Sequence, residues 1–135
     1  MRMIEWKDSY SVGIKAFDEE HKRLFEILNQ ITALFEVEDP KKLIAESLKD
    51  LESYTKIHFK SEEDLFNKYA YYNTDEQIKE HRFFMAKIDE FRKKYNASDM
   101  NVKLDMLEFL ADWIMAHTQG IDKDYRNFFH NRGIF

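Results

Sequence analysis

The sequence contains no cysteine, only one proline and only three glycines among its 135 residues. Without cysteine there are no disulfide bonds, thiolate metal ligands or catalytic thiols, so any reactive chemistry has to come from histidine, carboxylates, tyrosine or a bound metal. The scarcity of proline, glycine and β-branched residues disfavours a sheet with many turns and favours helices joined by short connections. We therefore expect an all-α protein.

Long apolar runs are also missing, since no stretch reaches the roughly 18 residues that a transmembrane helix needs. The first residues, MRMIEWKDSYSVGIK, lack the continuous apolar core and the small-residue cleavage site of a secretory signal. The formal net charge is -5, with acidic and basic residues interspersed and no basic stripe to neutralise phosphates. We expect a cytoplasmic protein that binds neither membrane nor nucleic acid.

The length suits one domain, residues 1–135, with a single core. Apolar residues recur at helical spacing in four segments, over residues 17–35, 44–69, 78–95 and 102–114. Because the links between these segments are short, consecutive helices are expected to run antiparallel. The sequence thus predicts an up-down-up-down four-helix bundle, with an N-terminal arm and a short C-terminal tail.

Four of the five histidines occupy positions in these stripes where an apolar residue is expected: His21, His58, His81 and His117. One such imidazole alone is more often a hydrogen-bonded core residue than a metal ligand. In an alternating bundle, however, the starts of the first and third helices and the ends of the second and fourth meet at one end. The four imidazoles are therefore expected to converge at one level.

Two acidic residues belong to the same level. Glu62 follows His58 by one turn, and Asp122 follows His117 by five residues, within reach if the helix loosens at Gly120. Either acid alone could be a solvated residue or a salt-bridge partner, but uncompensated burial would be costly. Imidazoles and carboxylates without thiolates suit iron, manganese, copper or zinc, and two bridging carboxylates indicate a pair of metals.

Several short motifs carry a resemblance to a known family. They are HKRLFEI, HFKSEE with an H-x-x-x-E spacing, EHRFFM, and HTQGID with an H-x-x-x-x-D spacing. Further matches are W-x-x-x-Y-x-V-G-I and FDEEHK near the beginning and D-K-x-Y near the end. In these residues the chain resembles a bacterial hemerythrin over essentially its full length.

The resemblance implies a four-helix bundle with a non-haem di-iron centre, two iron ions joined by an oxo or hydroxo bridge, that binds dioxygen reversibly. The implied ligands are His21, His58, Glu62, His81, His117 and Asp122. Glu62 and Asp122 would bridge the irons. His21 and His58 would hold the iron that receives dioxygen.

Met85 departs from the family pattern. In the family, the other iron has three histidines, two of them in an H-x-x-x-H pair, whereas here His81 is followed by Met85. Three outcomes are open: a thioether bond from Met85, an open or water-filled coordination position, or loss of that iron. Thioether sulfur is soft and neutral, so we favour the open or water-filled position, which is compatible with Met85 as a gap-filling core residue.

Ile114 and Phe59 are candidates for the apolar lining of an oxygen pocket, and equally for ordinary core. Trp113 and Tyr125 resemble aromatic positions that pack around the family's centre. The favoured function is a dioxygen carrier, store or sensor without turnover. The alternatives are a di-iron peroxidase or oxidase-like enzyme that uses an open coordination position, and a purely structural bundle.

Overall fold

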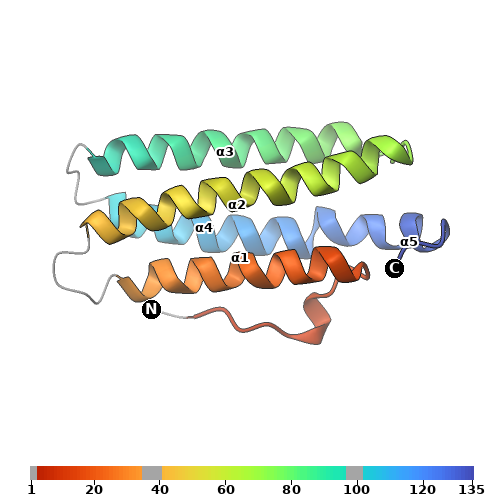
Figure 1. The fold of residues 1–135 in the computed structure, drawn as a ribbon, viewed down its shortest axis with the longest axis horizontal. Coiled ribbons are helices and arrows are strands. Elements are labelled where there is room, and N and C mark those ends of the chain that lie inside the picture. The colour runs from red at the N-terminus through yellow and green to blue at the C-terminus, as the bar shows by residue number, and fades with distance from the viewer. Residues whose placement is uncertain (1–2, 35–40, 97–101) are drawn as a thin grey trace.

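The computed structural model describes residues 3–34, 41–96 and 102–135, and the described part contains helices and no strand (Figure 1). In chain order the elements are η1 (Asp8–Tyr10), α1 (Lys15–Leu34), α2 (Lys41–Lys68), α3 (Thr74–Asn96), α4 (Val102–Gln119), η2 (Ile121–Asp124) and α5 (Tyr125–His130). Each of the four long helices contacts the next in sequence, and α4 contacts α1, which closes the bundle. Consecutive long helices run in opposite directions, so the expected all-α, up-down-up-down bundle is confirmed.

The main core lies between the four long helices and follows the helical spacing of apolar residues. In α1 the buried stripe comprises Phe17, His21, Leu24, Leu28 and Ile31. Each fully buried leucine or isoleucine contributes about 1.5–3 kcal/mol relative to an exposed side chain. The predicted first segment ends at residue 35, the second begins at 44, the third ends at 95 and the fourth begins at 102, and the side chains at these four positions lie outside the described set.

The third helix differs in one position from the stripe expected from the sequence. Ile78 is only partly buried, whereas the neighbouring Gln77 is fully buried. The Gln77 side-chain amide donates a hydrogen bond to Asp122 Oδ1 over 3.0 Å, and this bond compensates the burial of the amide nitrogen. Helical periodicity alone favours the apolar neighbour and misses this interaction.

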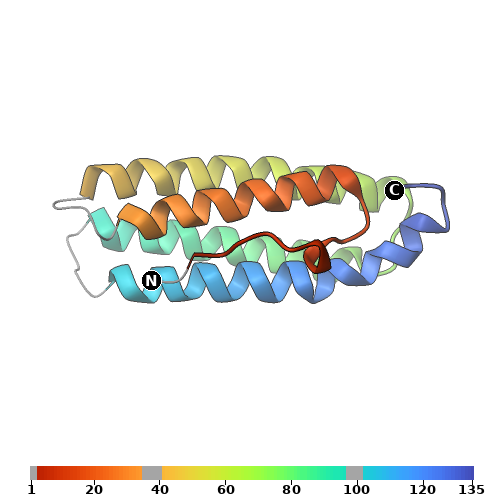
Figure 2. The ribbon, with the colours of Figure 1, turned by 90° about the horizontal axis from the view of Figure 1, so that it is seen from below.

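The N-terminal arm lies along α1 and α4 (Figure 2). Asn29 holds it on both sides, accepting from the Ile4 backbone N–H over 2.8 Å and donating to the Ile4 carbonyl over 2.7 Å. Tyr10 packs edge-on against Phe25. Gly13 then turns the chain into α1 with a φ of 82°, in the left-handed region that favours glycine. The arm thereby sets where α1 begins.

The predicted C-terminal tail is a packed part of the fold. η2 and α5 cover the end of the bundle, and α5 forms a second apolar cluster with the end of the N-terminal arm, the start of α1 and the end of α2. Its most buried members include Phe66, Tyr125 and Phe129. His130, outside the converging histidines, donates from Nε2 to the Gly13 carbonyl over 2.7 Å and ties α5 to the arm.

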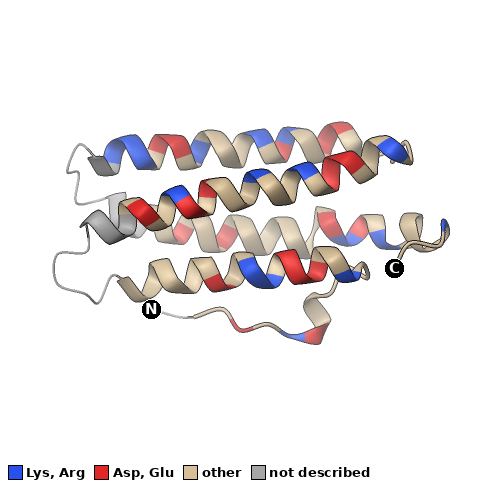
Figure 3. Cartoon of the chain, viewed as in Figure 1, with Lys and Arg blue, Asp and Glu red and all other residues tan. Residues whose placement is uncertain are grey.

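Acidic and basic positions are interspersed along α1, α2 and α3, whereas the described charged positions of α4 before its histidine are the acids Asp105, Glu108 and Asp112 (Figure 3). The first three long helices thus follow the interspersed pattern of the sequence. None of the described helices is both long enough and apolar enough to cross a membrane.

Candidate metal centre

The four histidines of the apolar stripes meet inside the bundle. His21 comes from α1, His58 from α2, His81 from α3 and His117 from α4, and all four side chains are buried. The rings form two pairs, with centroids 4.8 Å apart for His21 and His58 and 5.2 Å apart for His81 and His117. The antiparallel arrangement thus brings one imidazole from each long helix to one level.

The two predicted carboxylates lie between these pairs. Glu62 Oε1 is 3.1 Å from the Nε2 atom of His58 and 3.3 Å from that of His81. Asp122 Oδ2 is 3.2 Å from His21 Nε2, and its Oδ1 is 3.1 Å from His117 Nε2. Both carboxyl groups are fully buried. Each carboxylate therefore contacts one imidazole of each pair, as a bridging ligand would.

Asp122 reaches this position because α4 ends at Gln119 and the chain continues into the tighter turn of η2. Gly120 stands at the junction. A Cβ atom there would lie 2.5 Å from the Ala116 carbonyl oxygen, a backbone atom that cannot move aside cheaply. The loosening expected at Gly120 is present, and glycine is the residue that fits it.

Three glutamates face the Nδ1 atoms of three of the imidazoles, and two of these glutamates, Glu20 and Glu63, are hydrogen-bonded there. His58 Nδ1 lies 2.6 Å from Glu20, and His81 Nδ1 lies 2.9 Å from Glu63. His117 Nδ1 lies 3.5 Å from Glu80. A carboxylate at Nδ1 holds the proton there, so the Nε2 lone pair faces the centre.

These glutamates were not identified from the sequence, although a signal for them exists. Glu20 precedes His21, Glu63 follows Glu62 and Glu80 precedes His81. Each adjoins one candidate ligand in the chain and serves an imidazole of the next helix. An acidic neighbour beside each candidate ligand is therefore the pattern to look for.

The imidazoles and carboxylates of the site shift one another's pKa values. Burial is the largest single effect on His58 and lowers its pKa, but the Glu62, Glu20 and Asp122 carboxylates together outweigh burial and raise the pKa of His58 to about 10. At His117, Asp122, Glu80 and Glu62 together outweigh burial in the same way and raise the pKa to about 10. Against the effect of burial, His58 keeps the pKa of Glu62 well below its ordinary value. Without a metal, two protonated imidazoles balance two carboxylates, and a cation that binds has to displace those protons.

The donor atoms fit a metal cluster. The Nε2 atoms of all four histidines, Glu62 Oε1 and Asp122 Oδ2 are buried without a hydrogen-bond partner. They fall into two groups whose ligand atoms lie within 4.8 Å of one another: His21, His58, Glu62 and Asp122, and Glu62, His81 and His117. Shared carboxylates and sulfur-free donors suit a pair of metals such as iron.

Further side chains hold the ligands in place. The Tyr125 hydroxyl donates to Glu62 Oε2 over 3.0 Å, a role that the sequence interpretation as packing alone did not include. Trp113 stacks on His117, with ring centroids 4.4 Å apart. Phe59 stacks on His81 at 3.9 Å. Ile114, the other candidate for the oxygen pocket, is buried in the main core one turn before His117.

Met85 lies one turn after His81 on α3, partly buried against the main core. Its sulfur is 3.3 Å from the Thr55 hydroxyl of α2. Thr55 also lies 2.8 Å from the Leu51 carbonyl oxygen, a stronger acceptor than a thioether. Met85 thus stands one turn after His81, where the resemblance implies a histidine, and both this replacement and a role of Met85 as a ligand stay predictions.

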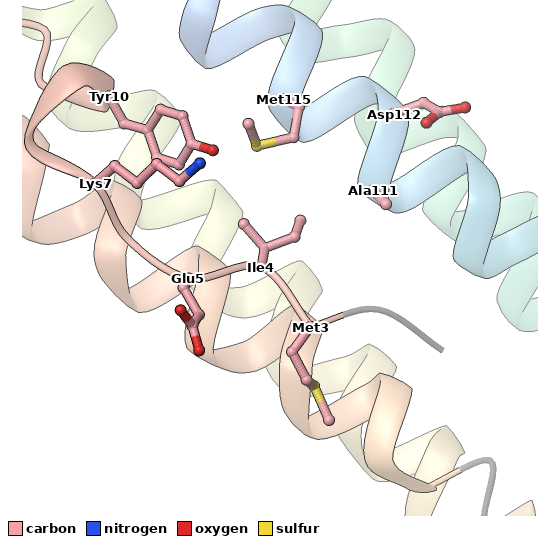
Figure 4. Close-up of a pocket in the computed structure, with 8 residues that line it drawn as sticks. All are labelled: Met3, Ile4, Glu5, Lys7, Tyr10, Ala111, Asp112 and Met115. Atoms are coloured by element: carbon pink, nitrogen blue, oxygen red, sulfur yellow. The ribbon is translucent and has the colours of Figure 1, made fainter.

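A separate groove of about 650 Å³ runs between the N-terminal arm and α4 (Figure 4). Its side chains include Met3 and Ile4 from the arm and Met115 from α4. No imidazole lines it. This groove is distinct from the candidate metal centre.

An antiparallel four-helix bundle with an interior of imidazoles and shared carboxylates defines a protein of the metal-binding helical-bundle class. Residues 12–128 match the family model described as the hemerythrin HHE cation binding domain. The chain belongs to the hemerythrin family. The resemblance seen in its motifs is confirmed.

Individual relatives agree with this assignment. The bacteriohemerythrin of Clostridium acetobutylicum is 32% identical over 127 residues, covering 91% of this chain and 98% of that protein. A hemerythrin-like protein of Naegleria gruberi is 27% identical, over 91% of each chain. A crystal structure of wild-type hemerythrin matches with a TM-score of 0.85 and 25% identity, over 93% of this chain and 97% of that chain.

The Glu63→Gln variant tests the outer carboxylates. An amide at position 63 holds the His81 proton less firmly than a carboxylate, so we expect metal affinity to fall by about 10–100-fold. Titration of the metal-free protein with ferrous iron measures this. The control is Glu19→Gln, because Glu19 is exposed and, among the described residues, pairs with Lys22 alone. Equal affinities for the two variants would contradict a role for Glu63.

Proposed function

We propose that this protein is a non-haem di-iron protein that binds dioxygen reversibly, as a carrier, store or sensor. The observation that carries the proposal is the placement of two buried carboxylates, Glu62 and Asp122, each between two imidazole pairs. Membership of the hemerythrin family supports iron as the metal. Bound iron would supply the reversible electron transfer that lets dioxygen bind and leave.

Each pair of histidines binds one of the two metals in this proposal. His21 and His58 hold the iron that receives dioxygen, and His81 and His117 hold the other, second iron. Tyr125 and Gln77 orient the bridging carboxylates by donating to the oxygens given above. Phe59 and Ile114 are proposed as apolar walls that exclude water.

The second iron site is proposed to be altered. The family pattern supplies a third histidine where this chain has Met85, so two imidazoles and the shared carboxylates remain. Iron prefers imidazole and carboxylate to a neutral thioether. We propose that an exogenous ligand or water takes the third histidine's position.

The test is the iron-to-protein ratio together with the visible absorption spectrum in air and under argon. We expect two iron ions per chain, and an absorption band that appears with oxygen and disappears on its removal. His58→Ala should lose iron, whereas His130→Ala should not, because His130 binds Gly13 outside the site. A reconstituted protein without iron would leave only the structural-bundle alternative.

A di-iron peroxidase or oxidase-like activity is the second candidate. It is favoured by a hollow in the surface that reaches Met85 and His81, through which a substrate could approach the second iron. Steady-state turnover with hydrogen peroxide and a reductant distinguishes this enzyme from a carrier. A cytoplasmic location and a single domain over residues 1–135 stay predictions.

A further inference from the structure

A hollow of about 400 Å³ opens between α2 and α3. Its inner wall includes Phe59, His81 and Met85. Phe59 and His81 are buried, whereas the outer residues Lys60 and Arg82 are exposed. The hollow thus leads from the surface to the side of the centre where the family histidine is replaced, and it shares no residue with the groove beside the N-terminal arm.

The inner wall is held in a fixed arrangement. Phe59 covers one face of the His81 ring, with an interplanar angle of 5°. Glu63, which also lines the hollow, binds the Nδ1 side of the same ring. The His81 Nε2 atom is buried without a hydrogen-bond partner, 3.3 Å from Glu62 Oε1. A ligand in the hollow therefore meets an imidazole already oriented toward the shared carboxylate.

The chemistry of Met85 favours a ligand from outside. A thioether is neutral and only a weak hydrogen-bond acceptor, so it neither satisfies a metal that prefers nitrogen and oxygen nor repels an anion. With the Thr55 hydroxyl 3.3 Å from its sulfur, Met85 faces α2 as well as the hollow. A metal with one fewer protein ligand accepts another donor, and a negatively charged one most strongly.

The outer wall has cationic side chains. Lys60 pairs with Asp64 over 2.9 Å. Lys56 pairs with Glu52 over 3.4 Å. Arg82 forms no ion pair within the described parts of the chain, and its guanidinium keeps its positive charge at any ordinary pH. The lining thus contains the cations Lys56, Lys60 and Arg82 against the acids Glu63 and Asp64, a surplus of one positive charge that attracts anions.

We propose that this hollow admits a small monoanion, which binds the second metal beside Met85 at the position that the family pattern gives to a histidine. The inference rests on the proposed di-iron function. It adds the class of ligand, the route by which the ligand enters, and the positive charge of Arg82 that favours anions. The anion would bind the metal held by His81 and His117, apart from the dioxygen site.

The experiment is a calorimetric titration of the iron-loaded full chain with azide, with iron content measured first. The wild-type protein is expected to bind one more azide per chain than Met85→His, in which an imidazole fills the position. Met85→Leu should bind as many as the wild type, because leucine also offers no nitrogen. Equal azide numbers for wild type and Met85→His overturn the inference.

Charge reversal at the mouth gives a second readout that does not depend on changing position 85. Arg82→Glu should weaken the additional azide on the order of fivefold at low salt, with a smaller effect at high salt. Lys93→Glu on the same helix, outside the hollow, should leave it unchanged. Equal effects of the two reversals count against entry through the hollow.

The outcomes separate the two proposals. If the wild type and Met85→His both load iron and Met85→His binds one azide fewer than the wild type, both proposals are supported. Iron loading with the same azide number in both proteins overturns only the anion site. A wild-type protein that loads one iron also overturns the anion site, because the second metal is then missing. No iron in any variant overturns the proposed function and this inference with it.

Discussion

Replacing Glu62 by glutamine is expected to remove most of the iron from the protein. The Glu62 carboxylate lies within 3.1–3.3 Å of an imidazole from each pair, so it serves both metals. Glutamine keeps the shape but loses the negative charge, and its amide nitrogen cannot replace a ligating oxygen. Removing a hydrogen-bond partner of a ligand already lowers metal affinity by about 10–100-fold. Removing a ligand that both metals share should therefore lower metal affinity by at least about 100-fold.

Elemental analysis after reconstitution measures the effect, and circular dichroism reports whether the bundle is intact. Asp64→Asn is the matched control, because Asp64 lies half a turn further along α2, is exposed and pairs with Lys60. In Glu62→Gln the buried, protonated His58 also loses its main counter-charge, so we expect a lower free energy of unfolding in the metal-free protein. Iron content equal to that of Asp64→Asn would exclude Glu62 as a bridging ligand.

Replacing Met85 by histidine is expected to raise the affinity for the second iron by on the order of 100-fold, or about 2.7 kcal/mol. A histidine there stands one turn after His81 on the same helix, so both imidazoles can reach one metal. Thr55 gives the new ring a partner, because its hydroxyl already lies 3.3 Å from the sulfur of Met85. Such a contact would help to fix the ring orientation.

The measurement is the iron-to-protein ratio at limiting iron, with the visible spectrum in air. Met85→Leu is the control, because it keeps the apolar volume and adds no ligand. We expect the ratio to rise for histidine and to stay unchanged for leucine. If Met85→His leaves both metal content and spectrum unchanged, position 85 is not a ligand position in this chain.

The bundle and the convergence of four imidazoles follow from the sequence because both depend on helical periodicity. Apolar residues that recur every 3.6 positions identify the buried face of a helix. Short connections make consecutive helices run in opposite directions. The approach of Asp122 was also open to prediction, since glycine marks the end of a helix. Residues that interrupt the stripe, such as His58, are informative because an apolar residue was expected there.

The positions that escaped prediction depend on contacts between helices. Gln77 is buried in place of Ile78 because it bonds Asp122, which comes from the far end of the chain. Glu20 pairs with His58 across helices, so spacing within α1 says nothing about it. The packing of α5 depends on aromatic contacts with α2, such as the one between Phe129 and Phe66. The short sequence of α5 does not by itself specify these contacts.

The candidate ligands are spread from α1 to η2, and Asp122 comes after all four long helices. During synthesis on the ribosome, a nascent chain therefore exposes its imidazoles well before the last carboxylate has emerged. Correct loading has to follow release of nearly the whole polypeptide, and a prematurely terminated product would lack one bridging position. A chain that ended before residue 122 would accordingly bind metal more weakly than the full chain.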